Sequence, residues 1–166
     1  MTLSALTALL DPIASAYNDA PLVQAATTFA HFAGLLLGGG FAIATDWATL
    51  RARTVDAVER RRQLALIHAA HRPVVGGLAL AFASGALMFV GDYETLATSP
   101  AFWAKMGIVA LLLANGGVMA RTETALRAAA PDESTGWRRL GLAAACSLTL
   151  WFAAVLAGTL LVNPTS

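Results

Sequence analysis

The sequence contains few charged residues and a single cysteine. Only 13% of its 166 residues are charged, which is about half the share that a soluble domain carries. The net charge of +1 gives no reason to expect a nucleic-acid partner. Because Cys146 is the only cysteine, an internal disulfide and a cysteine-based zinc or iron–sulfur site are excluded. Cys146 lies in an apolar run, so we expect a small, buried, apolar side chain there.

Long apolar stretches dominate the rest of the chain. Each has about the 20 residues that a helix needs to cross the hydrocarbon of a bilayer. They lack the polar face, repeated at helical spacing, that a soluble helix would carry. The sequence therefore predicts an all-α fold with one transmembrane domain over residues 1–166, a bundle of four transmembrane helices. The predicted helices cover about 22–44, 66–90, 101–120 and 140–162.

Arginine placement predicts how these helices are oriented. All ten arginines fall in or beside the first and third connections, whereas the only lysine, Lys105, lies at the other end of the third helix. Connections rich in basic residues stay in the cytoplasm. We therefore expect both termini on the outer side of a multi-pass protein of the bacterial inner membrane. The aromatic residues of the expected interfaces agree, since they lie near predicted helix ends: Trp47, Tyr93, Trp103 and Trp137.

Two further segments flank the spans. Residues 1–20 have apolar side chains at roughly helical spacing, which predicts a short amphipathic helix on the outer membrane surface, with Pro12 limiting its regularity. The same segment has no lysine or arginine before its apolar residues, so we do not expect a secretory signal. The mixed charges of Thr54–Leu64 indicate a helical extension beyond the lipid, able to meet anionic headgroups.

An ionisable group inside hydrocarbon is costly and is therefore a functional candidate. The fourth helix has no acid, base or histidine, so a nucleophile triad or a pair of catalytic carboxylates has no material here. His31 lies about ten residues into the first helix, and Gly34 and Gly38 share its face. We expect either a haem ligand with the macrocycle lying over these glycines, or ordinary small-residue packing with the imidazole bonded to another helix.

His68 and His71 share one face of the second helix and are candidates for a metal pair, or for a second ligand opposite His31. The alternative is a pair of interfacial histidines that touch lipid headgroups or water. His71 is the deeper of the two. However, His31 would lie about 20 Å from the cytoplasmic boundary and His71 about 8 Å from it, unless the second helix begins earlier, near Arg60.

Lys105 is closer in depth to His31. A neutral lysine could ligate iron or transfer protons, and the alternative is a side chain that extends to the outer headgroups. Copper handling is disfavoured because the methionines at 88, 106 and 119 are scattered. A non-haem iron site would have to use His68, His71 and Asp46 at the cytoplasmic rim.

Several short motifs resemble a group of small bacterial four-helix membrane proteins of uncharacterised families. These are loosely related to copper-resistance D-type proteins and to the bacterial membrane protoporphyrinogen oxidase. The resemblance covers the first three helices, about two-thirds of the chain, and implies a b-type haem held by His31 and Lys105. It gives no counterpart for His68 or His71, and we do not transfer the oxidase activity. The motifs are His31–Gly34, Gly38–Gly40 with Asp46, Gly85–Phe89, Phe102–Met106 and Asn115–Gly116.

These observations favour a membrane-embedded protein that binds haem b and moves electrons to or from a quinone or another redox subunit. His31 is the expected ligand, with His71 as second ligand by chemistry and Lys105 by resemblance. Two other functions remain open. One is a non-catalytic accessory or scaffold subunit of a homo- or hetero-oligomeric membrane complex, which its glycine-rich helices would suit. The other is a small transporter, which the lack of acids within the helices disfavours.

Overall fold

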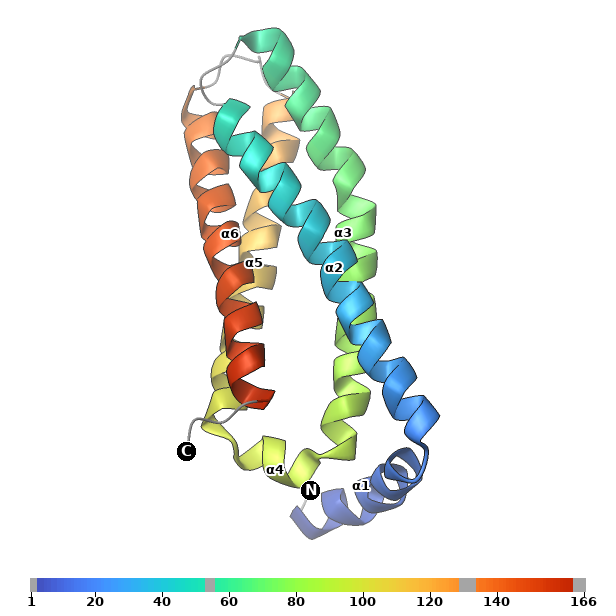
Figure 1. The fold of residues 1–166 in the computed structure, drawn as a ribbon. Helices are drawn as coiled ribbons and strands as arrows, with labels where there is room; N and C mark the ends of the chain where they lie inside the picture. Colours follow the sequence, from blue (N-terminus) through green and yellow to red (C-terminus); the bar gives the residue numbers. More distant parts are fainter. Residues whose placement is uncertain (1–2, 53–55, 129–133, 163–166) are drawn as a thin grey trace.

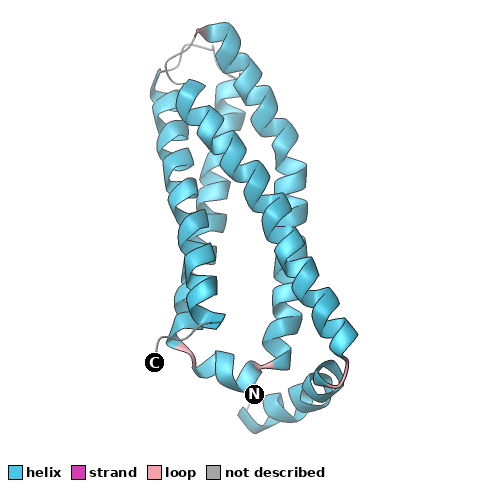
Figure 2. Cartoon of the chain, viewed as in Figure 1, coloured by secondary structure: helices cyan, strands magenta, loops and turns pink. Residues whose placement is uncertain are grey.

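The structure is a computed structural model that describes residues 3–52, 56–128 and 134–162. These residues form helices joined by short turns and contain no strand (Figure 2). In chain order the helices are α1 (Leu3–Asn18), α2 (Pro21–Ala52), α3 (Ala57–Gly91), α4 (Tyr93–Thr98), α5 (Pro100–Ala128) and α6 (Ser134–Val162).

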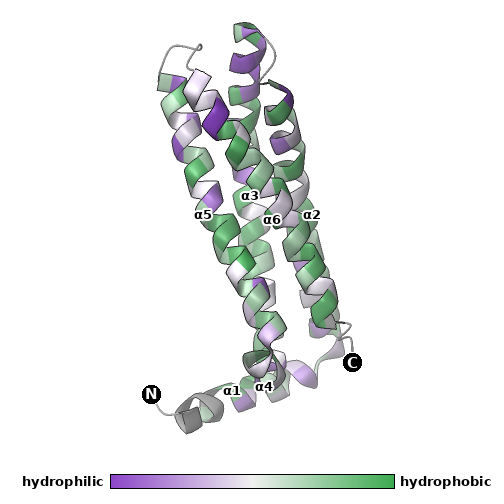
Figure 3. Cartoon of the chain, turned by 90° about the vertical axis from the view of Figure 1, so that its left-hand side faces the viewer, coloured by the Kyte–Doolittle hydropathy of each residue, from purple (hydrophilic) through white to green (hydrophobic). Residues whose placement is uncertain are grey.

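Four of the described helices, α2, α3, α5 and α6, are long and apolar enough to cross a membrane. The predicted all-α, multi-pass architecture is thereby confirmed. Hydrophobic residues cover the middle of these helices, and hydrophilic residues gather toward their two ends (Figure 3). The start of α2 and the end of α6 lie at the same end of the bundle, beside α1 and α4 (Figure 1). We call this the α1 end, and we call the other the arginine-rich end because it carries Arg51, Arg60, Arg61, Arg62, Arg121, Arg127, Arg138 and Arg139.

The helices are longer than their apolar stretches. At the arginine-rich end α2 continues to Ala52 instead of Ala44, and α3 begins at Ala57 instead of Leu66. The added turns contain residues that favour helix formation, and the Asp56 carboxylate caps α3 by accepting a hydrogen bond from Glu59 N at 2.9 Å. The expected helical extension within Thr54–Leu64 is confirmed from Ala57 onward, whereas Thr54 and Val55 lie outside the described residues.

Small residues hold α2 and α3 together. A Cβ atom placed on Gly34 would lie 2.6 Å from Ala81 N, and one on Gly38 would lie 3.2 Å from Leu78 N. On the facing helix, a Cβ atom on Gly77 would overlap the backbone of Gly38. Both backbones therefore approach at the positions that lack side chains, as small-residue interfaces of membrane helices do.

The pair α2–α3 meets the pair α5–α6 near the arginine-rich end, and in Figure 1 the ribbons of α2 and α6 diverge toward the α1 end. Trp151 of α6 fills the space beside Gly39 of α2, with ring atoms 3.1–3.2 Å from where a Cβ would lie. Nearer the arginine-rich end, a second buried cluster joins all four helices through Ala52, Leu64, Leu126, Trp137 and Leu140.

Two expectations about single side chains are wrong. Trp137 lies near the start of α6 as expected, but it is only 3% exposed and packs in the core instead of in an aromatic belt. Cys146 is exposed on the outward face of α6 and is not buried within the bundle. In both cases the helix was correctly placed, and the rotation of the helix about its axis decided which side chain faces a neighbour.

Short helices close the α1 end. The predicted N-terminal helix is present as α1, and it continues through Pro12. The connection between α3 and α5 contains α4, a helix of six residues. Asn18 Nδ2 donates to Gly91 O at 3.0 Å, and the Tyr93 hydroxyl donates to Asp11 Oδ1 at 2.5 Å. These hydrogen bonds fasten α1 to the end of α3 and to α4.

Candidate functional site

His31 lies against α3 through one ring nitrogen. Its Nδ1 is 2.8 Å from Ala81 O and 3.3 Å from the Ser84 hydroxyl oxygen. The Ser84 hydroxyl donates to Leu80 O at 2.6 Å. A Cβ atom on Gly85 would lie 3.2 Å from His31 Cε1, so the imidazole occupies a notch that this glycine leaves open. The ring is half-buried and fixed in orientation.

This hydrogen bond fixes the tautomer of the neutral imidazole. A backbone carbonyl can only accept, so Nδ1 carries the proton and donates it to Ala81 O. Nε2 then holds the lone pair, and it has no hydrogen-bond partner within residues 3–52, 56–128 and 134–162. Metal-bound histidines commonly show this arrangement, in which one nitrogen bonds a carbonyl and the other binds the metal.

Lys105 comes from the other helix pair. It lies on α5, and its side chain extends over α6, with Nζ 3.6 Å from where a Cβ of Gly158 would lie. Each residue lies in the half of its own helix that is nearer the α1 end: His31 is the eleventh residue of α2, and Lys105 is the sixth of α5. The two half-buried side chains therefore lie toward the same end of the bundle, on opposite helix pairs.

His68 and His71 lie elsewhere. Ala81, which binds His31, follows His71 by ten residues along α3, a rise of about 15 Å. Two axial ligands of one iron must lie only a few ångströms apart, so the structure does not bring His31 and His71 together. α3 does begin earlier than its apolar stretch, at Ala57, but His71 is still about 15 Å from the His31 site along the helix.

The two histidines also do not form a metal pair with Asp46. No group of three or more histidine, cysteine or acidic side chains that could hold a metal ion occurs within the described residues. Asp46 is 1% exposed in the interior of the bundle, and its Oδ2 has no hydrogen-bond partner among the described residues. His68 and His71 are exposed at the surface of α3, so a shared non-haem iron site is not supported.

Gly34 and Gly38 serve a different purpose from the one expected of a haem face. The backbone of α3 covers both positions so closely that a methyl group would not fit freely at either. A macrocycle could not lie there unless α2 and α3 separated. The expectation that haem lies over these glycines is therefore wrong, and the alternative of small-residue helix packing is correct.

The structure also contains a buried acid that sequence reasoning overlooked. The Glu123 side chain is only 7% exposed, with Oε1 3.3 Å from an Arg127 guanidinium nitrogen and 3.5 Å from His68 Nδ1. It therefore links α5 to α3 close to the arginine-rich end. Glu123 lies three residues beyond the predicted end of the third apolar stretch at Ala120, so hydropathy gave no reason to expect a buried side chain there. An acid next to arginine at helical spacing was the available signal.

A multi-pass α-helical membrane protein is thus the class that the fold defines. Among the residues proposed from the sequence, His31 and Lys105 are half-buried on opposite helix pairs toward the α1 end, in the described part of the chain. Comparisons with protein-family models, with curated proteins and with solved structures found no match to this chain.

Proposed function

We propose that this protein binds haem b through His31 Nε2 and transfers electrons within the membrane. The observation that carries the proposal is the hydrogen bond from His31 Nδ1 to Ala81 O, which leaves the other ring nitrogen unprotonated. Haem needs only one or two protein ligands, so the lack of a larger group of metal-binding side chains does not count against it. The bacterial inner membrane, with the arginine-rich end in the cytoplasm, is part of this proposal.

Lys105 is the better second ligand. It lies toward the same end of the bundle as His31, on the opposite helix pair, whereas His71 is separated from the His31 site by about 15 Å along α3. The amine binds iron only in its neutral form. The resemblance described above points to the same pair of residues.

The residues of this chain would have distinct tasks at such a site. When bound, a haem supplies one-electron chemistry. The Ala81 carbonyl holds the His31 ring in one tautomer and makes Nε2 a stronger donor. Ser84 and Gly85 define the notch that keeps the ring from rotating. A quinone or a membrane redox subunit is the electron partner that the apolar surroundings favour.

A second function, an accessory subunit of a membrane complex, is favoured by the exposed surface of α5. Only 6% of its most apolar 18-residue section is buried inside the bundle. Gly107, Ala110, Ala114 and Gly117 recur there at helical spacing, and all four are exposed. A face of small residues allows close approach of another transmembrane helix. Gly117→Leu would then release a partner that copurifies with the wild-type protein, whereas the haem proposal predicts an unchanged spectrum for this variant.

A reduced-minus-oxidised spectrum of the purified protein tests the haem proposal. We expect the wild type to show Soret and α bands. In Lys105→Ala these bands should be lost or should shift to those of a five-coordinate haem. In His71→Ala they should not change. His68→Ala is the matched control at the other histidine. A wild-type protein, purified from cells supplied with a haem precursor, that shows no such bands would refute the proposal. Loss of the bands in His71→Ala alone would overturn the ligand assignment.

A further inference from the structure

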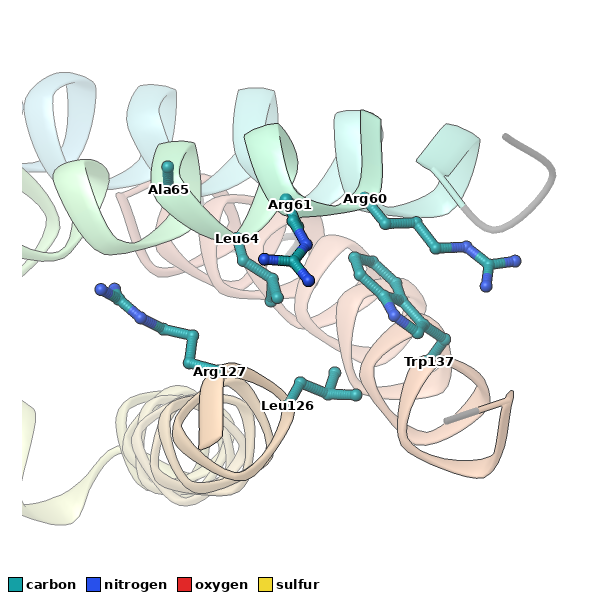
Figure 4. Close-up of a pocket in the computed structure, with 7 residues that line it drawn as sticks. All are labelled: Arg60, Arg61, Leu64, Ala65, Leu126, Arg127 and Trp137. Atoms are coloured by element: carbon teal, nitrogen blue, oxygen red, sulfur yellow. The ribbon is translucent and has the colours of Figure 1, made fainter. Parts of the chain in front are cut away.

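A pocket of about 240 Å³ lies between α3, α5 and α6 at the arginine-rich end. Figure 4 shows Arg61 extending from α3 toward Leu126 of α5, with the Trp137 ring of α6 closing one side. The pocket has no part in the His31 site, which lies further along the bundle toward the α1 end. Its lining consists of Arg60, Arg61, Leu64, Ala65, Leu126, Arg127 and Trp137.

The charge of this pocket is strongly positive. Three guanidinium groups line it, and the buried acid Glu123 pairs with Arg127 at 3.3 Å. The Arg60 guanidinium lies 5.7 Å from the centre of the Trp137 ring, which orients it by a cation–π contact. Arg61 forms no ion pair with any residue that the structure describes, and its side chain is exposed. A ligand with negative charge would therefore be attracted.

The rest of the lining is apolar. Leu64 and Leu126 are 7% and 3% exposed and form the floor of the pocket. Trp137 is also buried, and its indole Nε1 has no hydrogen-bond partner among the described residues. Buried donors normally have a partner, so this indole N–H is available to donate to an oxygen atom of a ligand. A free inorganic anion would gain nothing from the leucine floor, whereas a lipid would.

The depth of the pocket matches that of a lipid headgroup. Leu64 comes two residues before the apolar stretch of α3 that begins near Leu66, so the arginines lie just outside the hydrocarbon. Basic pockets between transmembrane helices at this level bind the headgroups of anionic phospholipids. A guanidinium group suits a phosphate because its planar fork donates two parallel hydrogen bonds.

From these four observations, we propose that this pocket binds the phosphate of an anionic phospholipid, with Arg61 and Arg127 contacting the phosphate oxygens and the leucine floor contacting the adjoining glycerol and acyl carbons. The lipid would connect α3 to α5 and α6, which otherwise meet there through Glu123 and the buried cluster of leucines. The proposal does not depend on haem binding.

Native mass spectrometry of the detergent-purified full chain tests this proposal. The probes are phosphatidylglycerol, phosphatidylcholine and inorganic phosphate, each titrated separately. We expect phosphatidylglycerol to bind at least fivefold more tightly than phosphatidylcholine, and Arg61→Gln to reduce that affinity about fivefold, the effect of about one basic contact at a membrane surface. Arg138→Gln is the matched control, because Arg138 lies exposed at the same end and does not line the pocket.

Each other outcome would overturn a stated part of the proposal. Equal loss in Arg61→Gln and Arg138→Gln would mean a general effect of charge and no built site. Equal binding of both lipids would refute recognition of the anionic headgroup. Inorganic phosphate that competes fully with the lipid at equal concentration would assign the site to a free anion. Arg127→Gln leaves the buried Glu123 with one partner fewer, so Arg61→Gln, checked for unchanged helical content, decides the test.

Discussion

At the scale of single residues, Gly76 and Gly77 illustrate how strongly a neighbour decides the role of a glycine. A Cβ on Gly77 would overlap the backbone of Gly38 in α2, whereas nothing lies within 4 Å of a Cβ on Gly76. Backbone atoms of a packed helix cannot move aside as the end of a flexible side chain can. Substitution of the two glycines therefore has opposite consequences.

We expect Gly77→Ala to lower the free energy of unfolding by about 1–3 kcal/mol, because α2 and α3 must separate to admit the methyl group. Gly76→Ala should leave stability unchanged or raise it by up to about 1 kcal/mol, because alanine favours helix more than glycine does. Thermal unfolding in detergent, followed by circular dichroism, compares the two variants. If both lost stability equally, the close contact of α2 with α3 would be incorrect.

How much of the site the sequence predicted also depends on single residues. The depth of His31 within an apolar helix marked it correctly as a residue that needs a partner. The partner could not be predicted, because it is the backbone carbonyl of Ala81, and a carbonyl is present at every position. The roles of Gly34 and Gly38 were misread for a related reason: a bare glycine face accommodates either a ligand or a second helix, and composition does not tell the two apart.

At the scale of elements, the contact of α1 with α4 changes the pKa of the Tyr93 hydroxyl. The hydrogen bond to Asp11, together with burial and the charges of Asp11 and Glu94, raises the pKa of the Tyr93 hydroxyl to about 12 from its usual value of 10.0. Because this pKa is raised in the folded protein, the hydrogen bond contributes fully below pH 10 and is lost as the pH rises through 12. The contact therefore persists at neutral pH.

An ultraviolet titration of tyrosinate absorbance checks the raised pKa of Tyr93. The chain has two tyrosines, so Tyr93→Phe identifies which step belongs to Tyr93. We expect a step near pH 12 in the wild type that moves toward 10 in Asp11→Asn, because the amide no longer holds the proton as a carboxylate does. A step that stays in place in Asp11→Asn would argue against the contact between α1 and α4.

The elements themselves were predicted well in their apolar parts and poorly at their ends. Apolar residues defined where α2, α3, α5 and α6 lie, but each helix extends further at the arginine-rich end, because charged residues continue a helix once it has begun. The helix α4 went unrecognised because six residues are too few for a periodic pattern.

At the scale of the whole molecule, arginine placement predicts how the bundle is oriented across the membrane. Arginines gather at one end of the bundle, while α1, α4 and the end of α6 lie at the other (Figure 1). Basic connections remain in the cytoplasm, so the α1 end should face outward. Which helix pairs meet, and that they diverge toward the α1 end, could not be read from composition, since every helix is apolar on most of its surface.

Cysteine labelling in intact cells tests the orientation. In a background of Cys146→Ala, Thr98→Cys places the only thiol at the α1 end, and Ser134→Cys places it at the arginine-rich end. We expect a membrane-impermeant maleimide to label Thr98→Cys directly and Ser134→Cys only after the membrane is permeabilised. The reverse pattern would invert the topology.

The central claim concerns the whole molecule too, because His31 and Lys105 belong to different helix pairs that a cofactor would join. The haem content of purified His31→Asn tests it most directly. The asparagine amide can keep donating to Ala81 O, whereas it offers no imidazole nitrogen to iron. In His31→Asn we predict that bound haem is lost, while the haem-free protein keeps the thermal stability of the haem-free wild type. In His31→Ala we predict that haem is lost and that the free energy of unfolding also falls by about 1 kcal/mol. Wild-type haem content in His31→Asn, or no haem in the wild type itself, would contradict the account.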